Sequence, residues 1–171
     1  MTDSNPSNPE TREPALAFLA HDHSHCCGAV LAQAEVLTEA NGTRLTPVRR
    51  RVLEILSEAH RALGAYEVLE RLVADGFGNQ PPVAYRALDF LVEQGLAHRI
   101  QRLNAFTACM HPGPTHNPAF FICRTCGMVA EAPDGAVRAA VADAAAGLGF
   151  AVERTTIEVL GLCPACPGQP A

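Results

Sequence analysis

Two cysteine pairs with the same spacing are the residues best suited to chemistry in this chain of 171 residues. They are Cys123-x-x-Cys126 and Cys163-x-x-Cys166, and each follows a strand-like apolar stretch. Each pair can present two thiolates from one tight turn, and four thiolates make a closed tetrahedral Zn²⁺ site. A redox-active motif is the alternative, but it needs only one pair, placed where a helix begins. Two pairs at strand ends favour structural zinc.

Other residues of metal-ligand type are spread over the middle of the chain. They are His98, Cys109, His116 and Glu131. A nitrogen, sulfur and oxygen set of this kind can bind Zn²⁺ tetrahedrally, and more weakly than four thiolates. Taken singly, they also fit plainer interpretations, namely surface histidines, a small core cysteine and a solvated carboxylate. His111 is a competing ligand close to Cys109, so spacing alone leaves this second site open.

Composition predicts a folded, soluble, cytoplasmic protein. Apolar residues make up 48% of the chain, enough for a buried core. No apolar run approaches the roughly 20 residues of a membrane span. Residues 1–14 lack the basic start and the apolar stretch of a signal peptide. In a reducing cytoplasm, the seven cysteines are expected to be metal ligands or thiols rather than disulfides.

Charge is distributed unevenly, although the net charge is −5. Residues 44–102 hold nine Arg against seven acidic residues and are net positive by two. The segments on either side, 1–43 and 103–171, are net negative by five and two. A phosphate-facing surface is therefore expected in the middle third.

The middle third must fold into the elements that would present such a surface. Helical spacing predicts helices over about 29–40, from Thr46-Pro47 onward, from Ala65 to Gly76 and from Pro81 to Gly95. In the last of these, Tyr85, Arg86 and Asp89 point away from the apolar stripe. Two strands follow, over 96–100 and 105–109, joined by a turn. The last three of these helices, followed by the two-stranded hairpin, make a winged helix-turn-helix.

The C-terminal third has a different pattern. It predicts strands over 119–122 and 128–131, a helix over 134–148 and a long strand over 150–162. The fold class is therefore α+β, an N-terminal winged helix-turn-helix DNA-binding domain followed by a C-terminal α/β dimerisation domain with a four-cysteine zinc site. The expected boundaries are a flexible tail with a His/Cys tract (1–28), the winged-helix domain (29–109), a link (110–118) and the dimerisation and zinc-binding domain (119–171).

The order of these motifs resembles the ferric uptake regulator superfamily, over roughly residues 29–166. The resemblance is carried by Arg44-Leu45-Thr46-Pro47, Ala65-Tyr66, Tyr85-Arg86-Ala87-Leu88-Asp89-Phe90-Leu91, Phe121-Ile122-Cys123-x-x-Cys126-Gly127 and Gly161-Leu162-Cys163-x-x-Cys166. Iron- and peroxide-sensing relatives carry a His-rich run in the link, whereas here Pro114-Thr115-His116 holds a single His. The chain is in this respect similar to the zinc uptake regulator branch.

The resemblance implies a zinc-responsive repressor that binds operator DNA as a homodimer and shuts off zinc-uptake genes. It implies two Zn²⁺ per protomer, one structural at the four paired cysteines and one regulatory at His98, Cys109, His116 and Glu131. It also implies an AT-rich palindromic operator, contacted by Tyr66, Tyr85 and Arg86. Val83 and Ala84 stand where Thr and Val are usual in this family. The helix cap or phosphate contact that the threonine would make is therefore left open here. The tract His21–Cys27 lies outside the shared motifs and is either a flexible tail or an auxiliary zinc site.

Three other functions remain as alternatives. A regulator of the same superfamily could sense iron, manganese or nickel, although the thiol of Cys109 disfavours hard Mn²⁺. An enzyme is not expected, because the sequence has no His-Glu-x-x-His, nucleophile motif or cofactor loop. A metal-storage protein would use the His/Cys tract and would bind zinc without preferring any DNA.

Overall fold

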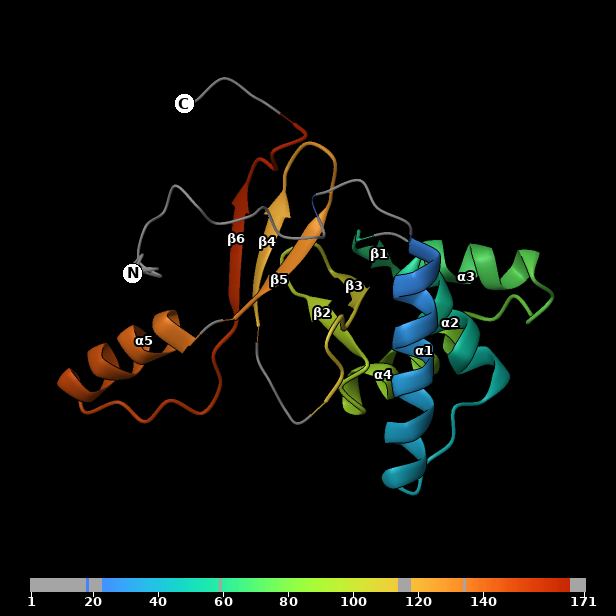
Figure 1. Cartoon of the computed structure of the whole chain (residues 1–171), viewed down its shortest axis with the longest axis horizontal. Coiled ribbons are helices and arrows are strands. Elements are labelled where there is room, and N and C mark those ends of the chain that lie inside the picture. Colours follow the sequence, from blue (N-terminus) through green and yellow to red (C-terminus); the bar gives the residue numbers. More distant parts are fainter. Residues whose placement is uncertain (1–17, 19–22, 59, 114–117, 134, 167–171) are drawn as a thin grey trace, which may run out of the picture.

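The computed structural model describes residue 18 and residues 23–58, 60–113, 118–133 and 135–166. Helices and strands alternate irregularly along these ranges, as the α+β class predicts (Figure 1). In chain order they are α1 (His23–Ala40), α2 (Pro47–Ser57), β1 (Leu63–Gly64), α3 (Ala65–Ala74), α4 (Pro81–Glu93), β2 (Ala97–Ile100), β3 (Ala105–Ala108), β4 (Ala119–Cys123), β5 (Val129–Ala132), α5 (Gly135–Gly147) and β6 (Ile157–Gly161).

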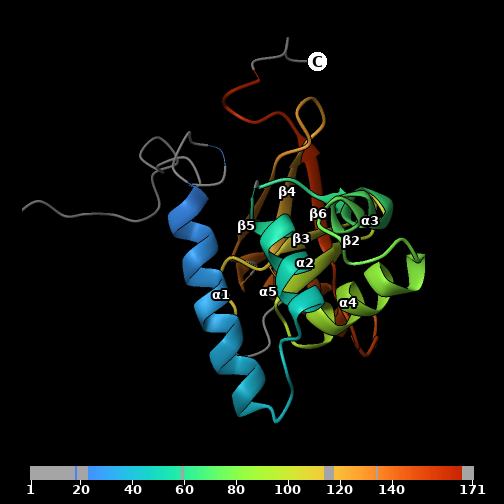
Figure 2. The same cartoon turned by 90° about the vertical axis from the view of Figure 1, so that its right-hand side faces the viewer.

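Helices α1 to α4 pack together and bury the apolar stripes that the sequence predicts (Figure 2). Helix α2 begins where expected, with Pro47 in its first turn and Thr46 in extended conformation before it. Thr46 makes no side-chain capping bond, so proline and buried Val52 and Leu56 set this start instead. Helical spacing places Val73 on the apolar side of α3 with Val68, Leu69 and Leu72, yet Val73 is 45% exposed and so departs from the pattern.

Strands β2 and β3 form the predicted hairpin and pair in antiparallel register, Ala97 opposite Ala108. Asn104 in their turn has a positive φ of 47° and accepts a hydrogen bond from Arg99. A third strand, β1, completes the sheet in the order β1-β3-β2. Periodicity did not reveal β1, because two residues are too few to show an alternation.

The second sheet has the order β5-β4-β6, with β5 antiparallel and β6 parallel to β4. The predicted strand over 150–162 is wrong in length, since β6 covers only Ile157–Gly161. Its ladder with β4 runs from Ala119 to Cys123, and a strand cannot extend beyond the partner with which it pairs. Helix α5 lies to one side of this sheet, and Ala145 is its one buried residue (Figure 1).

Two clusters of buried apolar residues hold the elements together. The larger draws all its members from residues 30–108. The smaller joins Ile100 of β2 to Phe120, Ile122 and Val129 of the second sheet. One face of the second sheet is therefore covered by the hairpin of the first, which Figure 1 shows between the helices and β4–β6.

The N-terminal helix is longer than expected. Helix α1 begins at His23 rather than near Ala29, so 23–28 have a helical backbone where a flexible tail was expected. The remainder of the expected tail, apart from residue 18, lies outside the described residues. Among the described helices, none has the length and apolar character needed to cross a bilayer.

Candidate metal centres and nucleic-acid interface

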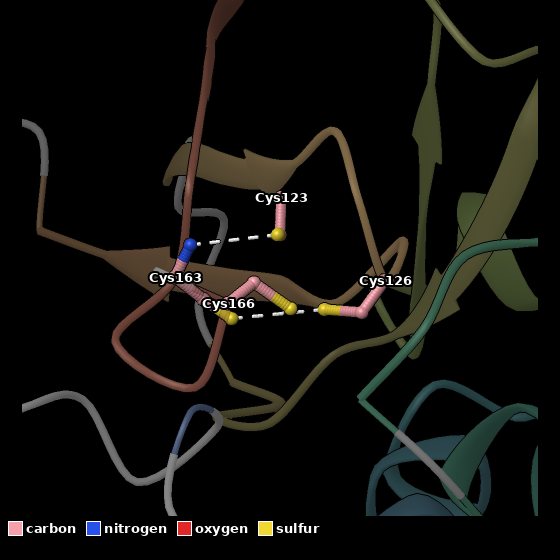
Figure 3. Close-up of side chains that lie close together, drawn as sticks. All are labelled: Cys123, Cys126, Cys163 and Cys166. Atoms are coloured by element: carbon pink, nitrogen blue, oxygen red, sulfur yellow. Dashed lines mark hydrogen bonds between the residues drawn. The ribbon is translucent and has the colours of Figure 1, made fainter. Parts of the chain in front are cut away.

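The four paired cysteines converge at one end of the second sheet (Figure 3). Their sulfur atoms all lie within 4.8 Å of one another. The Sγ atoms of Cys126 and Cys163 are 3.7 Å apart. Four sulfurs at a Zn–S distance of ~2.3 Å are separated by about 3.8 Å along a tetrahedral edge. This spacing fits Zn²⁺ and is far longer than the roughly 2 Å of a disulfide.

Strand ends and tight turns bring these sulfurs together. Cys123 ends β4, and the turn after it closes with a 3.0 Å bond from the N–H of Gly127 to the Cys123 carbonyl. Gly127 has a φ of +73°, a conformation that a glycine adopts without strain. The second pair follows β6, whose parallel pairing with β4 places both pairs at the same edge. Cys166 closes its own turn by donating to the Cys163 carbonyl at 3.0 Å.

The thiols of this cluster differ widely in pKa. The pKa of Cys123 falls to about 6, because the backbone N–H groups of Cys126 and Cys163 point at its sulfur. The pKa of Cys166 rises to about 12, because its thiol bonds to the sulfurs of Cys126 and Cys163. Like charges this close cannot all form without a cation between them. A bound divalent cation removes this conflict, and thiolate is the form that binds it.

Three of the four residues proposed for the second site also converge. His98 from β2, Cys109 after β3 and Glu131 from β5 place their ligand atoms within 4.8 Å of one another. His98 Nε2 lies 3.5 Å from Glu131 Oε1, close to the ~3.4 Å between nitrogen and oxygen ligands of one tetrahedral zinc. The fourth expected ligand, His116, lies outside the described residues. His111 is exposed and does not join this cluster within the described ranges.

Burial raises the pKa values of the two acidic groups in this second cluster, Glu131 and Cys109. The carboxyl of Glu131 accepts a hydrogen bond from the N–H of Met110 at 3.3 Å, yet burial raises its pKa to about 7. Burial, together with the charge of Glu131, raises the pKa of the Cys109 thiol to about 12. A cation bound among these groups would reverse both shifts, because it stabilises the ionised forms. The donor set therefore fits a mixed zinc site.

The three candidate DNA contacts lie on the exposed surface of α3 and α4. Tyr66 is 65% exposed in the first turn of α3, and Tyr85 is 41% exposed in α4. Arg86 beside it is also exposed. Buried Ala84, Ala87 and Leu88 hold the opposite side of α4 in the core, which turns these two side chains outward.

The arginine run of α2 is engaged within the chain. Arg50 pairs with Glu35 of α1, and Arg51 pairs with Asp75 at 2.6 Å. The guanidinium of Arg49 lies 3.5 Å from the centre of the Phe90 ring. These contacts join α2 to α1, to the end of α3 and to α4, so the run serves packing between helices.

A family model described as "Ferric uptake regulator family" matches residues 40–160, most of the chain. The chain belongs to the ferric uptake regulator family. The match runs from α2 into β6, and therefore includes both helices that carry the candidate DNA contacts, all three residues of the second cluster and the first cysteine pair.

Within this family, the similarity is high to regulators named for zinc. The zinc uptake regulation protein of Escherichia coli (strain K12) is 41% identical over 138 residues, 80% of this chain and 81% of that protein. The Shigella flexneri protein of the same name gives the same values. A zinc uptake regulator in complex with zinc and DNA superposes with a TM-score of 0.76 at 40% identity, covering 81% of this chain and 93% of that one. Holo XcZur gives 0.71 at 35% identity, covering 84% and 97%.

Sequence reasoning missed two residues at the seam, the contact between the β2–β3 hairpin and the second sheet. Phe120 lies with its ring centre 5.2 Å from that of His98. Glu158 accepts hydrogen bonds from the turn between β2 and β3. The available signal was an acidic residue within the otherwise apolar run Ile157-Glu158-Val159-Leu160, since strands with one buried face rarely carry one without a partner.

Proposed function

We propose that this protein is a zinc-responsive transcriptional repressor, which binds operator DNA as a zinc-loaded homodimer and shuts off zinc-uptake genes. The observation that carries the proposal is 41% identity to a zinc uptake regulation protein over 80% of the chain. A regulator of this family is not an enzyme. We further propose that it acts in the cytoplasm, where operator DNA is reached and thiols stay reduced.

The protein binds zinc, and we assign two ions to each protomer. Cys123, Cys126, Cys163 and Cys166 hold the structural ion, supported by their mutual spacing. His98, Cys109, His116 and Glu131 hold the regulatory ion, supported for three of them by the cluster at the seam. Zinc, when bound there, supplies a positive centre on which nitrogen, sulfur and oxygen ligands can converge.

The regulatory ligands come from both halves of the chain. His98 and Cys109 belong to the winged hairpin, whereas Glu131 belongs to the second sheet. Their convergence fixes the hairpin, and the helices packed on it, relative to that sheet. Ligand binding thereby selects one orientation from those the free protein samples. We take 29–109 as the DNA-binding domain, 110–118 as the link and 119–171 as the dimerisation domain, with 1–28 as an N-terminal tail.

The protein binds DNA, and we assign base and phosphate contacts to Tyr66, Tyr85 and Arg86. Arg86 has the forked donors that read guanine in the major groove. Tyr85 is suited to a phosphate or a thymine methyl, and Tyr66 to the backbone at the start of α3. A homodimer presents two such surfaces, which matches a palindromic operator with one half-site per protomer. We propose an AT-rich operator, as in the family that the chain resembles.

The homodimer is supported by apolar surface in the C-terminal part of a single chain. Val137, Val141 and Leu148 recur at helical spacing on α5 and its end, with exposures of 47%, 37% and 83%. Phe150 is 67% exposed. Monomers rarely leave a large apolar patch in water. Strand β6 is also an edge of its sheet among the described strands, and a second copy can cover such an edge.

Fluorescence anisotropy on a duplex from upstream of a zinc-transporter gene tests the proposal. The duplex is titrated at buffered free Zn²⁺, Fe²⁺ and Mn²⁺. We expect tight binding with zinc alone, and loss of it in His116→Ala with the dimer intact. Binding driven by iron or manganese would keep the family and change the metal. Zinc uptake with no preference for any tested duplex would instead favour metal storage.

A further inference from the structure

The carboxylate of Glu158 joins the second sheet to the tip of the wing. The backbone N–H of Gln101 donates to Oε1 at 2.7 Å, and that of Arg102 donates to Oε2 at 2.9 Å. Both donors lie in the turn between β2 and β3, 57 and 56 residues from Glu158 along the chain. A carboxylate that accepts one bond on each oxygen is fixed in both position and orientation.

The register of the second sheet places this contact in one row with the proposed regulatory site. Phe120 of β4 lies opposite Glu131 on β5 and opposite Glu158 on β6. Residues opposite one another across strands point to the same face of a sheet. Glu131, Phe120 and Glu158 therefore form a transverse row on the face that meets the wing.

Strand β2 of the wing runs along this row. His98 lies at its Glu131 end, with its ring against Phe120, and the turn lies at its Glu158 end. Two strand spacings cover ~9.6 Å, and the extended chain from His98 to Arg102 covers ~13 Å. The two lengths are comparable, so the row can hold both ends of β2. A cleft of about 720 Å³ adjoins the row and is lined by residues of both parts, Arg99, Gln101 and Glu153 among them.

We propose that Glu158 is a positioning residue that fixes the wing turn on the second sheet and acts as the pivot of the wing. Its two hydrogen bonds need no metal, so the turn stays attached whether or not the regulatory ligands are joined. With the wing held only at this end of β2, by Glu158 and by the packing of Ile100 on the second sheet, it can rotate about that end. Two attachments, at Glu158 and at the His98–Glu131 end, define its orientation and hence that of α4.

Amide hydrogen exchange of the full-length protein tests the anchor without DNA. In the zinc-loaded and regulatory-zinc-free forms alike, we expect Glu158→Ala to speed exchange at Gln101 and Arg102 by about three- to tenfold. Glu158→Gln should act mainly on one amide, because its side chain keeps one acceptor oxygen. Glu153→Gln is the matched control, since this exposed glutamate has no hydrogen-bond partner among the described residues. Unchanged exchange at both amides in Glu158→Ala would overturn the proposal.

The effect on regulation rests on the function proposed above and has its own measurement. DNA affinity is measured with and without saturating zinc for the wild type, Glu158→Gln and Glu153→Gln. We expect Glu158→Gln to reduce the zinc-dependent gain in affinity at least about threefold, at an unchanged melting temperature. An anchor seen by exchange with an unchanged zinc gain would refute the pivot role. A wild type without any zinc gain would refute the proposed function and leave the exchange test standing.

Discussion

At the scale of the residue, Glu131 shows how burial creates a place for a cation. A carboxyl in water ionises near pH 4.5, whereas burial raises the pKa of Glu131 to about 7. Its neighbours are a buried thiol, Cys109, and the ring of His98. Neither the carboxyl nor the thiol ionises readily here without a positive charge beside it, and the carboxyl, the thiol and the imidazole are all metal ligands. Without a metal, these three buried polar side chains lower the stability of the folded protein. With a metal present, the same side chains bind it.

Zinc binding at this site should therefore depend on pH. Protons compete with metal for each ligand, because His98 must be neutral and Cys109 and Glu131 must be ionised to bind. With the Glu131 pKa near 7, acidification from pH ~8 to ~5.5 protonates it and lowers zinc affinity. We expect zinc-dependent DNA binding to weaken over this range at fixed free zinc, as measured by anisotropy.

Glu131→Gln provides the control for that prediction, since its amide does not titrate. This variant should bind the regulatory zinc at least about tenfold more weakly and with a shallower pH dependence. The stability of the metal-free protein should depend on pH in the opposite direction to zinc affinity. Since the folded state raises the Glu131 pKa, its contribution to stability falls as pH rises between about 4.5 and 7. Wild-type affinity that stays flat from pH ~8 to ~5.5 would argue against these ligands.

The structural cluster predicts a different response to ligand loss. Cys163→Ser removes one of the four sulfurs and weakens the link that a bound metal makes between the turn after β4 and the turn after β6. We expect loss of the dimer and a broad, early thermal transition in circular dichroism, because structural zinc contributes directly to folding. Cys27→Ser is the control, since its thiol lies on α1, outside both clusters. A folded, dimeric Cys163→Ser protein that still represses would contradict the structural role.

At the scale of the element, helical periodicity predicted the four N-terminal helices because each buries one continuous stripe. Ala84, Ala87, Leu88 and Leu91 recur at helical spacing in α4, and all four are buried. Periodicity failed where pairing decides the outcome. The alternating run over 150–162 contains only five strand residues, because β4 offers no longer partner. The two residues of β1 were missed because their strand depends on β3, not on their own pattern.

Helix α4 makes a prediction that separates DNA contact from helix packing. We expect Arg86→Ala to weaken operator binding by about 1–3 kcal/mol, through loss of base contacts, with little change in thermal stability. Arg50→Ala is the matched control, since Arg50 pairs with Glu35 and Glu54 within the chain. It should change DNA affinity much less and lower stability by ~1 kcal/mol or less. Equal losses of DNA affinity in both variants would show that α4 is not the reading helix.

At the scale of the whole molecule, the two halves share a core that the sequence could not reveal. Ile100 belongs to the winged hairpin by sequence, yet it packs on Phe120, Ile122 and Val129 of the second sheet. Residue pattern assigns a side chain to a buried face but does not say which element covers it. The four-cysteine site was predictable because the spacing within each pair is local. The cluster of His98, Cys109 and Glu131 is not local: residue type suggested the set, spacing left it open, and the family resemblance then favoured it.

The C-terminal part of the molecule leads to a prediction about assembly. Helix α5 buries only Ala145 against its own chain, and Val141 remains 37% exposed at the middle of its apolar face. A charge placed there must be desolvated if a second protomer covers α5, so Val141→Glu should raise the dimer dissociation constant at least about tenfold in analytical ultracentrifugation. Val36→Glu makes the same chemical change on α1, where Val36 is 62% exposed, and should leave the dimer intact.

Because a palindromic operator needs two linked recognition helices, the Val141 variant should also lose operator affinity while keeping both zinc ions. A dimer equally stable in the two variants would mean that α5 faces solvent in the assembled protein and that the protomers meet elsewhere.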